Sequence, residues 1–335
     1  MPVFDVQNPE AAAVRNPRLE AQQLIGDGFD ARVLEPSPPA VVDGEWFADD
    51  PVAVGPIPPG RRVVSPVPAA DLTWDGWLAD RPEYRDWAAA RWLGAYRRLV
   101  RPPATFAVTR LAFHRLAVYV VSPARRRANG KIALRWTFGG MGTPFFGADE
   151  QVRVAGTRLI RQQGNAVAVE PLTTLARAAI FALDGPPDVA WAEPFDVPPP
   201  GDLNAELPVD LEAAMFLGDW YGFAYSVLET LRADTASVQA SRVQLWPEHF
   251  DAAFECLPDE THRRAGFGAS PGDAAVGEPY LYVNPWYFHE APSSGLWNAT
   301  SFRGAILPLS EFVDAPDQRA AALTFFRQRR ARLEV

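Results

Sequence analysis

The sequence predicts an α+β protein, with largely antiparallel sheets on which helices pack and a proline-rich extended arm at the N-terminus. The order of the expected elements predicts the fold class, and the composition predicts a globular chain. Stretches with helical spacing precede and follow groups of short strand-like segments, without the regular strand–helix–strand alternation that is typical of a parallel sheet. Hydrophobic residues make up 48% and charged residues 22% of the 335 residues, as in globular chains that bury a substantial core.

The N-terminal arm is predicted over residues 1–70, where proline recurs in PSPPAVVDG, VAVGPIPPG and VVSPVP. Each proline fixes φ, removes a backbone donor and favours extended backbone in the residue before it. Apolar pairs within this segment indicate that the arm lies against the body of the protein instead of acting as a pure linker.

A first half with the order helix, strands, helix is predicted over residues 71–195. Helical spacing begins at residue 83, and a second helix is expected over 107–121, which is apolar on both sides and should be deeply buried. KIALRWTF (131–138) alternates as a strand does, residues 151–170 indicate a short meander, and residues 171–183 return to helical spacing.

A second half with the same order is predicted over residues 203–335. It follows DVPPPGD (196–202), because three successive prolines suit neither a helix nor a central strand. Helices at 210–233 and 316–331 flank strands in SRVQLW, EPYLYVNPWYF and RGAILPL. The two halves could also form one continuous domain.

Charge and composition narrow the class of partner. The net charge of −9 would repel a phosphate backbone, and we expect Arg125, Arg126 and Arg127 to be a solvated cap at a helix end, so no nucleic-acid partner is predicted. No apolar window is long enough to span a bilayer and the N-terminus has no signal core, which predicts a soluble cytoplasmic protein without a membrane partner. Cys256 is the only cysteine, and we expect it to be a small buried hydrophobe.

The main candidate site is the stretch QLWPEHFDAAFEC, residues 244–256. As a continuous strand it would place His249, Asp251 and Glu255 on one face and apolar side chains on the other. A histidine beside an aspartate can be a base with its orienting carboxylate, or a pair of metal ligands. Two alternatives stay open: the stretch could be helical, or the histidine and the carboxylate could only hold two strands in register.

A neighbouring hairpin strand would add acidic and aromatic side chains to this site. The catalytic candidates are therefore His249, Asp251 and Glu278. The ligand-binding candidates, expected around a pocket between sheet and helices, are Trp246, Tyr280, Tyr282 and Trp286.

Metal binding has weaker support in the sequence. There is no H-E-x-x-H motif and no cysteine pair, so a structural zinc site is not expected. His249, Asp251 and His289 are candidate ligands only if the fold brings them together. The sequence leaves the cofactor open.

Two glycine-containing motifs favour turns. Residues 268–272, GASPG, fit the G-x-S-x-G pattern of serine hydrolases, but Pro271 lacks the backbone N–H that an oxyanion hole needs, and we expect a turn without a buried strand before it. TFGGMGTPFFG (137–147) could present backbone N–H groups to an anion beside Arg135 or Arg153, but a turn between strands is the favoured interpretation.

Several longer motifs resemble a family of bacterial proteins that is typical of actinobacteria and is classed as a domain of unknown function. The resemblance covers roughly residues 105–330 and implies a bacterial, cytoplasmic origin, but no activity and no catalytic residue. It is carried by QLWPEHFDAAFE, GASPGD, EPYLYVNPW, WNATSFRGAILPLSEF, RLAFHRLAVYVVSPAR and GKIALRWTFGGMGTPFF.

Three classes of function therefore remain. The favoured class is a small-molecule-binding protein or enzyme with a pocket near residues 246–286. The alternatives are a protein–protein interaction or scaffolding protein and a metal-dependent hydrolase or isomerase. The sequence leaves the ligand and the oligomeric state open.

Overall fold

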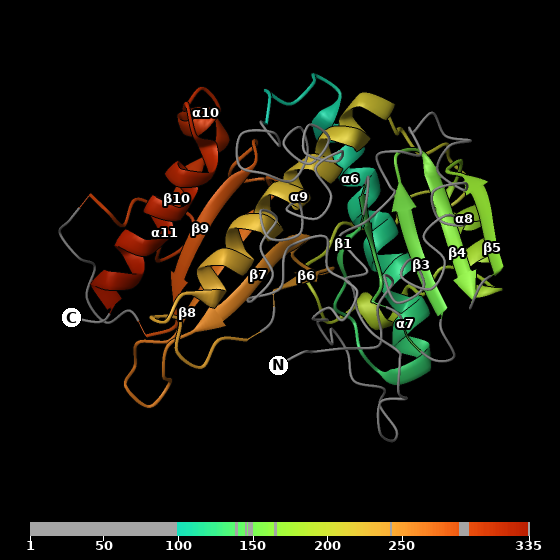
Figure 1. The fold of residues 1–335 in the computed structure, drawn as a ribbon. Coiled ribbons are helices and arrows are strands. Elements are labelled where there is room, and N and C mark those ends of the chain that lie inside the picture. The colour runs from blue at the N-terminus through green and yellow to red at the C-terminus, as the bar shows by residue number, and fades with distance from the viewer. Residues whose placement is uncertain are drawn as a thin grey trace, which may run out of the picture.

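The computed structural model describes residues 99–333, except 138–139, 145, 147–149, 164–165, 242 and 288–294. The predicted arm (1–70) and nearly all of the helix predicted from residue 83 lie outside these residues. The described chain folds into two antiparallel five-stranded sheets with helices packed on them, which confirms the α+β prediction (Figure 1). None of the described helices is long and apolar enough to cross a bilayer.

The helix predicted over 107–121 is longer than the sequence suggested. It comprises α6 (Phe106–Leu116), a π-helical turn η3 (Ala117–Val121) and α7 (Ser122–Asn129), and it ends at Gly130 with φ of 77°. All five residues of η3 are buried. The predicted deep burial is therefore confirmed at the centre of the helix, where apolar side chains lie on every side.

Of the arginine cluster at the end of this helix, Arg127 is exposed as predicted, but Arg125 and Arg126 are not solvated caps. Arg125 is only 1% exposed, and its guanidinium donates to the carbonyl of Ala133. Arg126 forms an ion pair of 2.6 Å with Asp188 and lies over the ring of Trp191. The prediction was wrong because these long side chains turn back to satisfy carbonyl and carboxylate groups of the following segments.

The first sheet is a meander in the order β1-β2-β3-β4-β5. Its strands are β1 (Arg135–Thr137), β2 (Gly140–Gly142), β3 (Glu150–Ala155), β4 (Arg158–Gln163) and β5 (Ala166–Pro171). The meander predicted over 151–170 is confirmed. The glycines of β2 pair with β3, and a Cβ on Gly142 would lie 2.5 Å from that of Arg153, so they serve close strand packing instead of an exposed anion-binding turn.

Three helical segments follow the first sheet. They are α8 (Leu175–Leu183), the 3-10 turn η4 (Ala190–Ala192) and the long α9 (Leu211–Ala233). Thr174 caps α8 by accepting a hydrogen bond from the N–H of Arg177, and Asp210 caps α9 by accepting from the N–H of Ala213. These caps explain why the helices begin close to their predicted starts.

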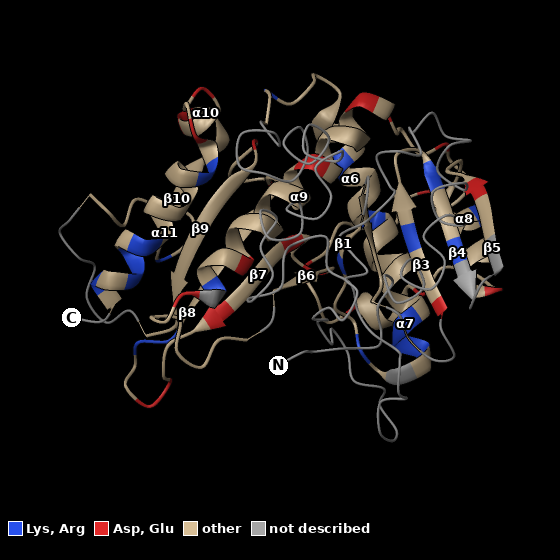
Figure 2. Ribbon diagram, viewed as in Figure 1, with Lys and Arg blue, Asp and Glu red and all other residues tan. Residues whose placement is uncertain are grey.

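The second sheet is also a meander, in the order β10-β9-β8-β7-β6. Its strands are β6 (Gln244–Trp246), β7 (Asp251–Cys256), β8 (Ala265–Ser270), β9 (Tyr280–Pro285) and β10 (Ala305–Pro308). The short α10 (Leu309–Phe312) and the predicted terminal helix, α11 (Gln318–Leu333), complete the fold. Basic residues gather in the second half of α11 (Figure 2), where Arg327 and Arg330 bind Asp234 at the end of α9.

The two sheets meet edge to edge in the middle of the molecule. Leu134, just before β1, and Leu245 of β6 exchange two backbone hydrogen bonds of 2.7 and 2.9 Å. Helix α9 lies across this junction and contacts β1, β2 and β3 as well as β7 and β8 (Figure 1). One continuous set of buried apolar residues therefore runs through both halves of the described chain.

The candidate stretch 244–256 is a hairpin and not one continuous strand. Residues 247–250 form a turn between β6 and β7, closed by a hydrogen bond of 2.7 Å from the N–H of Phe250 to the carbonyl of Trp246. Phe250 has a φ of 54°, which is unusual for a residue with a side chain. Its ring is buried and Tyr221 donates to its carbonyl, so packing offsets the backbone strain.

Candidate functional site

The two faces of the second sheet differ in chemistry. Period-two alternation directs the side chains of Ala252, Phe254 and Cys256 to the core, where α9 and α11 pack. The alternate positions, including Asp251 and Glu255, point to the opposite side, which we call the outer face. The predicted division of this strand into an apolar and a polar face is thus confirmed from residue 251 onward, and Cys256 is buried as expected.

A cavity of about 450 Å³ lies on the outer face, over β6, β7, β8 and β9. Sequence reasoning expected a pocket between the sheet and the helices, whereas this cavity is on the side of the sheet that α9 and α11 do not cover. Five of the predicted site residues line it: Trp246, His249, Asp251, Tyr282 and Trp286.

Two other predicted site residues in the described part of the chain, Tyr280 and Glu278, do not line the cavity. Tyr280 donates a hydrogen bond of 2.5 Å to Asp273 in the loop after β8. The carboxylate of Glu278 accepts from the N–H and the hydroxyl of Ser310, each at 2.8 Å, and so holds the start of α10. His289 lies outside the described residues.

Asp251 is the most unusual group in the cavity. It is 5% exposed, Oδ2 accepts a hydrogen bond from the hydroxyl of Tyr282, and Oδ1 has no hydrogen-bond partner among the described residues. Burial raises the pKa of Asp251 to about 6, against the opposing effect of the Tyr282 hydrogen bond and of the nearby His249. Asp251 can therefore hold or release a proton close to neutral pH.

The turn between β6 and β7 positions His249 and Glu248 at the cavity. His114 of α6 supports this turn: its Nε2 donates to the carbonyl of Pro247 at 3.0 Å, and its ring stacks on Phe250 with the centroids 4.9 Å apart. Burial lowers the pKa of His114 to about 4, so the ring is neutral at pH 7. His114 therefore packs beneath the turn as a neutral ring and hydrogen-bonds to its backbone.

The rim of the cavity contains a second carboxylate with its own cation. Glu255 accepts from Arg264 at 3.2 Å, and the guanidinium of Arg264 lies 5.2 Å from the centroid of the half-exposed Trp286 ring. Arg264 therefore balances the charge of Glu255 and stacks on an indole at the same time.

The sequence analysis placed Glu255 on the face of Asp251 but proposed none of the remaining polar residues of the cavity as site residues: Ser241, Gln244, Glu248, Glu255 and Asn284. A signal for three of them was present, because Gln244, Glu255 and Asn284 alternate with apolar neighbours in their strands. That signal becomes usable only with the strand register, which places Gln244 opposite Ala253 and Asn284 opposite Gly266.

The candidate serine ends a strand instead of sitting in an isolated turn. Ser270 is the last residue of β8, which is largely buried, so the expectation that no buried strand precedes it was wrong. Its hydroxyl accepts from the N–H of Gly272, whose φ of 101° forms the predicted turn. Two glycines weaken the strand signal of AGFGAS, which explains the error.

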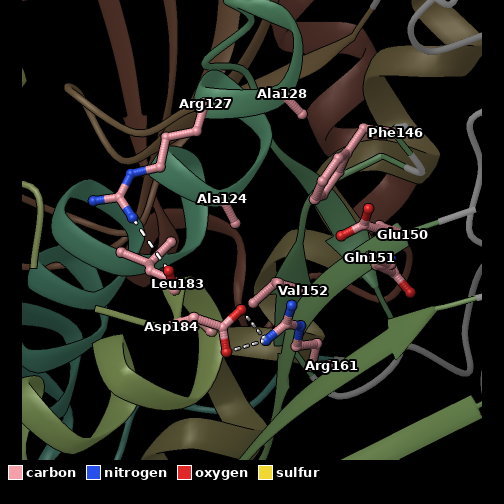
Figure 3. A pocket seen from close by; sticks show the side chains of 11 residues that line it. Ala124, Arg127, Ala128, Phe146, Glu150, Gln151, Val152, Arg161, Leu183 and Asp184 are labelled. Carbon is pink, nitrogen blue, oxygen red and sulfur yellow. Dashed lines mark hydrogen bonds and ion pairs between the residues drawn. The ribbon is translucent and has the colours of Figure 1, made fainter. Parts of the chain in front are cut away.

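A smaller cavity of about 250 Å³ lies in the first half, between α7, α8 and the first sheet (Figure 3). Three of its four charged groups are engaged with the protein: Arg161 and Asp184 form an ion pair of 2.9 Å, and Arg127 donates to the carbonyl of Leu183. Gln151 donates to the carbonyl of Thr143. This cavity therefore makes a weaker candidate site than the outer-face cavity.

In the described part of the chain, no group of three or more His, Cys, Asp or Glu side chains is placed to hold a metal ion. His249 and Asp251 do line the same cavity, but the third predicted ligand, His289, falls outside that part.

Comparison of the chain with protein-family models, with curated proteins and with solved structures finds no match. A function for this protein is therefore inferred from the geometry of the outer-face cavity.

Proposed function

We propose that this protein binds a small organic molecule in the outer-face cavity. The observation that carries the proposal is Asp251, a nearly fully buried carboxylate that lines a cavity of about 450 Å³ and has one oxygen without a partner among the described residues. An unpaired buried acceptor costs about 1–3 kcal/mol, and a bound molecule that donates a hydrogen bond would remove this cost.

The composition of the cavity supports the same proposal. Its volume lies within the range of small-molecule sites, and two indoles, Trp246 and Trp286, supply the apolar surface that such sites use. The amides of Gln244 and Asn284 and the ring of His249 add donors and acceptors that would fix the orientation of a ligand.

The test is a thermal-shift screen of a metabolite library, followed by titration of each hit. A ligand that binds only the native state raises the melting temperature. We expect hits with the wild-type protein that are lost in Trp286→Ala and Asp251→Asn. Phe195→Ala, which removes another partly exposed aromatic ring in the other half of the chain, should keep them. A complete absence of hits, or hits that persist in both cavity variants, would contradict the proposal.

A further inference from the structure

We infer that the ligand of the outer-face cavity carries an organic cation, such as a protonated amine, which binds between Asp251, Glu248 and Trp246. This inference rests on the proposed function and names the chemical class of the ligand.

The first support is a pair of buried acceptors. Oδ1 of Asp251 and Oε2 of Glu248 are both buried, line or border the same cavity, and have no hydrogen-bond partner among the described residues. Ionised carboxylates only accept hydrogen bonds, whereas an ammonium group carries three donors and no acceptor. One ammonium group could therefore satisfy both oxygens with charge-assisted hydrogen bonds.

The second support is the charge of the lining. Three carboxylates line the cavity, and Arg264 already compensates that of Glu255. Asp251 and Glu248 remain, with only His249 as a basic group, since no lysine or arginine is among the described residues that line the cavity. An anionic ligand would be repelled here, and a cation would be attracted.

The third support is that the protein already holds a cation of its own between a carboxylate and an indole at the rim of the cavity. Arg264 is a cation of the protein itself, held between the carboxylate of Glu255 and the indole of Trp286. A second carboxylate–indole pair lies deeper, because Trp246 and Asp251 are directly opposite each other across the β6–β7 hairpin and project to the same face. In this second pair the ligand would take the place that Arg264 has in the first.

The protonation state of Asp251 fits this assignment. Without a ligand, burial raises its pKa to about 6, so an uncompensated charge at this position is unfavourable. A cation within hydrogen-bond distance would favour the ionised form and lower the pKa of Asp251 again.

The experiment uses three probes of nearly the same size: benzylamine, benzyl alcohol and benzoate. Binding to the full-length protein at pH 8 is measured by saturation-transfer NMR and calorimetry. We expect benzylamine to bind at least about tenfold more tightly than benzyl alcohol, and benzoate to bind most weakly. Asp251→Asn should reduce the preference for the amine to less than about threefold, mainly by weakening the binding of benzylamine. Glu193→Gln, a change of an exposed carboxylate elsewhere, should leave the preference unchanged.

The outcomes separate the two proposals. Equal binding of all three probes, or a preference for benzoate, overturns the cation inference. The same holds if no probe binds while the metabolite screen gives hits that Trp286→Ala removes, and in both cases the proposed function stands. If neither the probes nor the screen gives a ligand, both proposals fail.

Discussion

The hydroxyl of Tyr282 reaches Oδ2 of Asp251 by passing over the strand that lies between them. Tyr282 is on β9 and Asp251 on β7, and β8 separates the two strands. Gly268 of β8 is the residue opposite Tyr282, and a Cβ at this position would lie 2.5 Å from the phenol oxygen. The missing side chain at residue 268 therefore lets the phenol lie flat across the sheet and bind the carboxylate.

Gly268→Ala should displace Tyr282 and break its hydrogen bond to Asp251. We expect a loss of about 2 kcal/mol in the free energy of unfolding, from overpacking and from the unsatisfied carboxylate, measured by urea denaturation. The matched control is Gly266→Ala on the same strand and the same face, where the new Cβ would meet only the carbonyl of Asn284 at 3.9 Å. A change within about 0.5 kcal/mol is expected for the control. Equal effects of the two substitutions would contradict the role of Gly268.

Asp251→Asn should stabilise the protein much more at pH 8 than at pH 4. The folded-state pKa of Asp251, about 6, lies above its ordinary value of 3.8, so ionisation of the folded protein costs stability as the pH rises from about 4 to above 6. Asparagine avoids this cost, and we expect a gain of about 3 kcal/mol at pH 8 that falls below about 1 kcal/mol near pH 4. Urea denaturation across this range measures it. Asp314→Asn, at an exposed carboxylate, should show no such pH-dependent gain.

His114→Gln should remove a loss of stability that the wild-type protein suffers in acid. The folded-state pKa of His114, about 4, lies below its ordinary value of 6.5, so the unfolded chain takes up a proton first as the pH falls. The wild type should lose about 3 kcal/mol between pH 7 and pH 4 from this group alone. Glutamine keeps a donor for the carbonyl of Pro247 without titrating. His262→Gln, at an exposed histidine, should retain the acid loss, and an unchanged pH profile in His114→Gln would refute the expectation.

The acid effects of Asp251 and His114 oppose each other between about pH 4 and pH 6, since protonation favours the fold at one residue and disfavours it at the other. The pH profile of the wild type alone would hide both. The contribution of each group is therefore measured as the difference in unfolding free energy between variant and wild type at the same pH.

Gly222→Ala should destabilise the protein although alanine is the better helix former. A Cβ at residue 222 of α9 would lie 2.9 Å from the ring of Trp136 on β1, so the helix approaches the sheet more closely than a methyl group allows. We expect a loss of about 1–3 kcal/mol in thermal or urea unfolding, instead of the gain of about 1 kcal/mol typical of an exposed helix. Combining it with Trp136→Phe should recover part of the loss, because the smaller ring makes room. Additive effects would contradict this contact.

Much of the fold could be predicted from local patterns. The strands of 151–170 alternate clearly, and α8 and α9 combine helical spacing with capping residues, Thr174 and Asp210. Residues 247–250 could not be predicted in the same way, because the turn depends on Phe250 adopting a positive φ. Only tertiary contacts with His114 and Tyr221 make that conformation favourable.

Only part of the candidate site could be predicted from the sequence, because the rest depends on tertiary packing. Alternation indicated that Asp251 and Glu255 share a face, but which face carries the helices depends on how the sheet packs against α9. Arg264 was missed because its contacts with Glu255 and Trp286 join three separate segments. The local pattern of one strand shows which of its residues share a face, but not which residues of other strands lie beside them.

Because α9 packs on both sheets, cutting the chain before this helix would expose apolar surface on both fragments. A fragment ending before residue 211 would leave the ring of Trp136 and the inner sides of β1 to β3 in water, and the remaining fragment would expose the side of α9 that they cover. Neither piece would be expected to fold by itself, but each offers the surface that the other lacks. The protein should therefore lend itself to fragment complementation, with the two pieces regaining structure only when mixed.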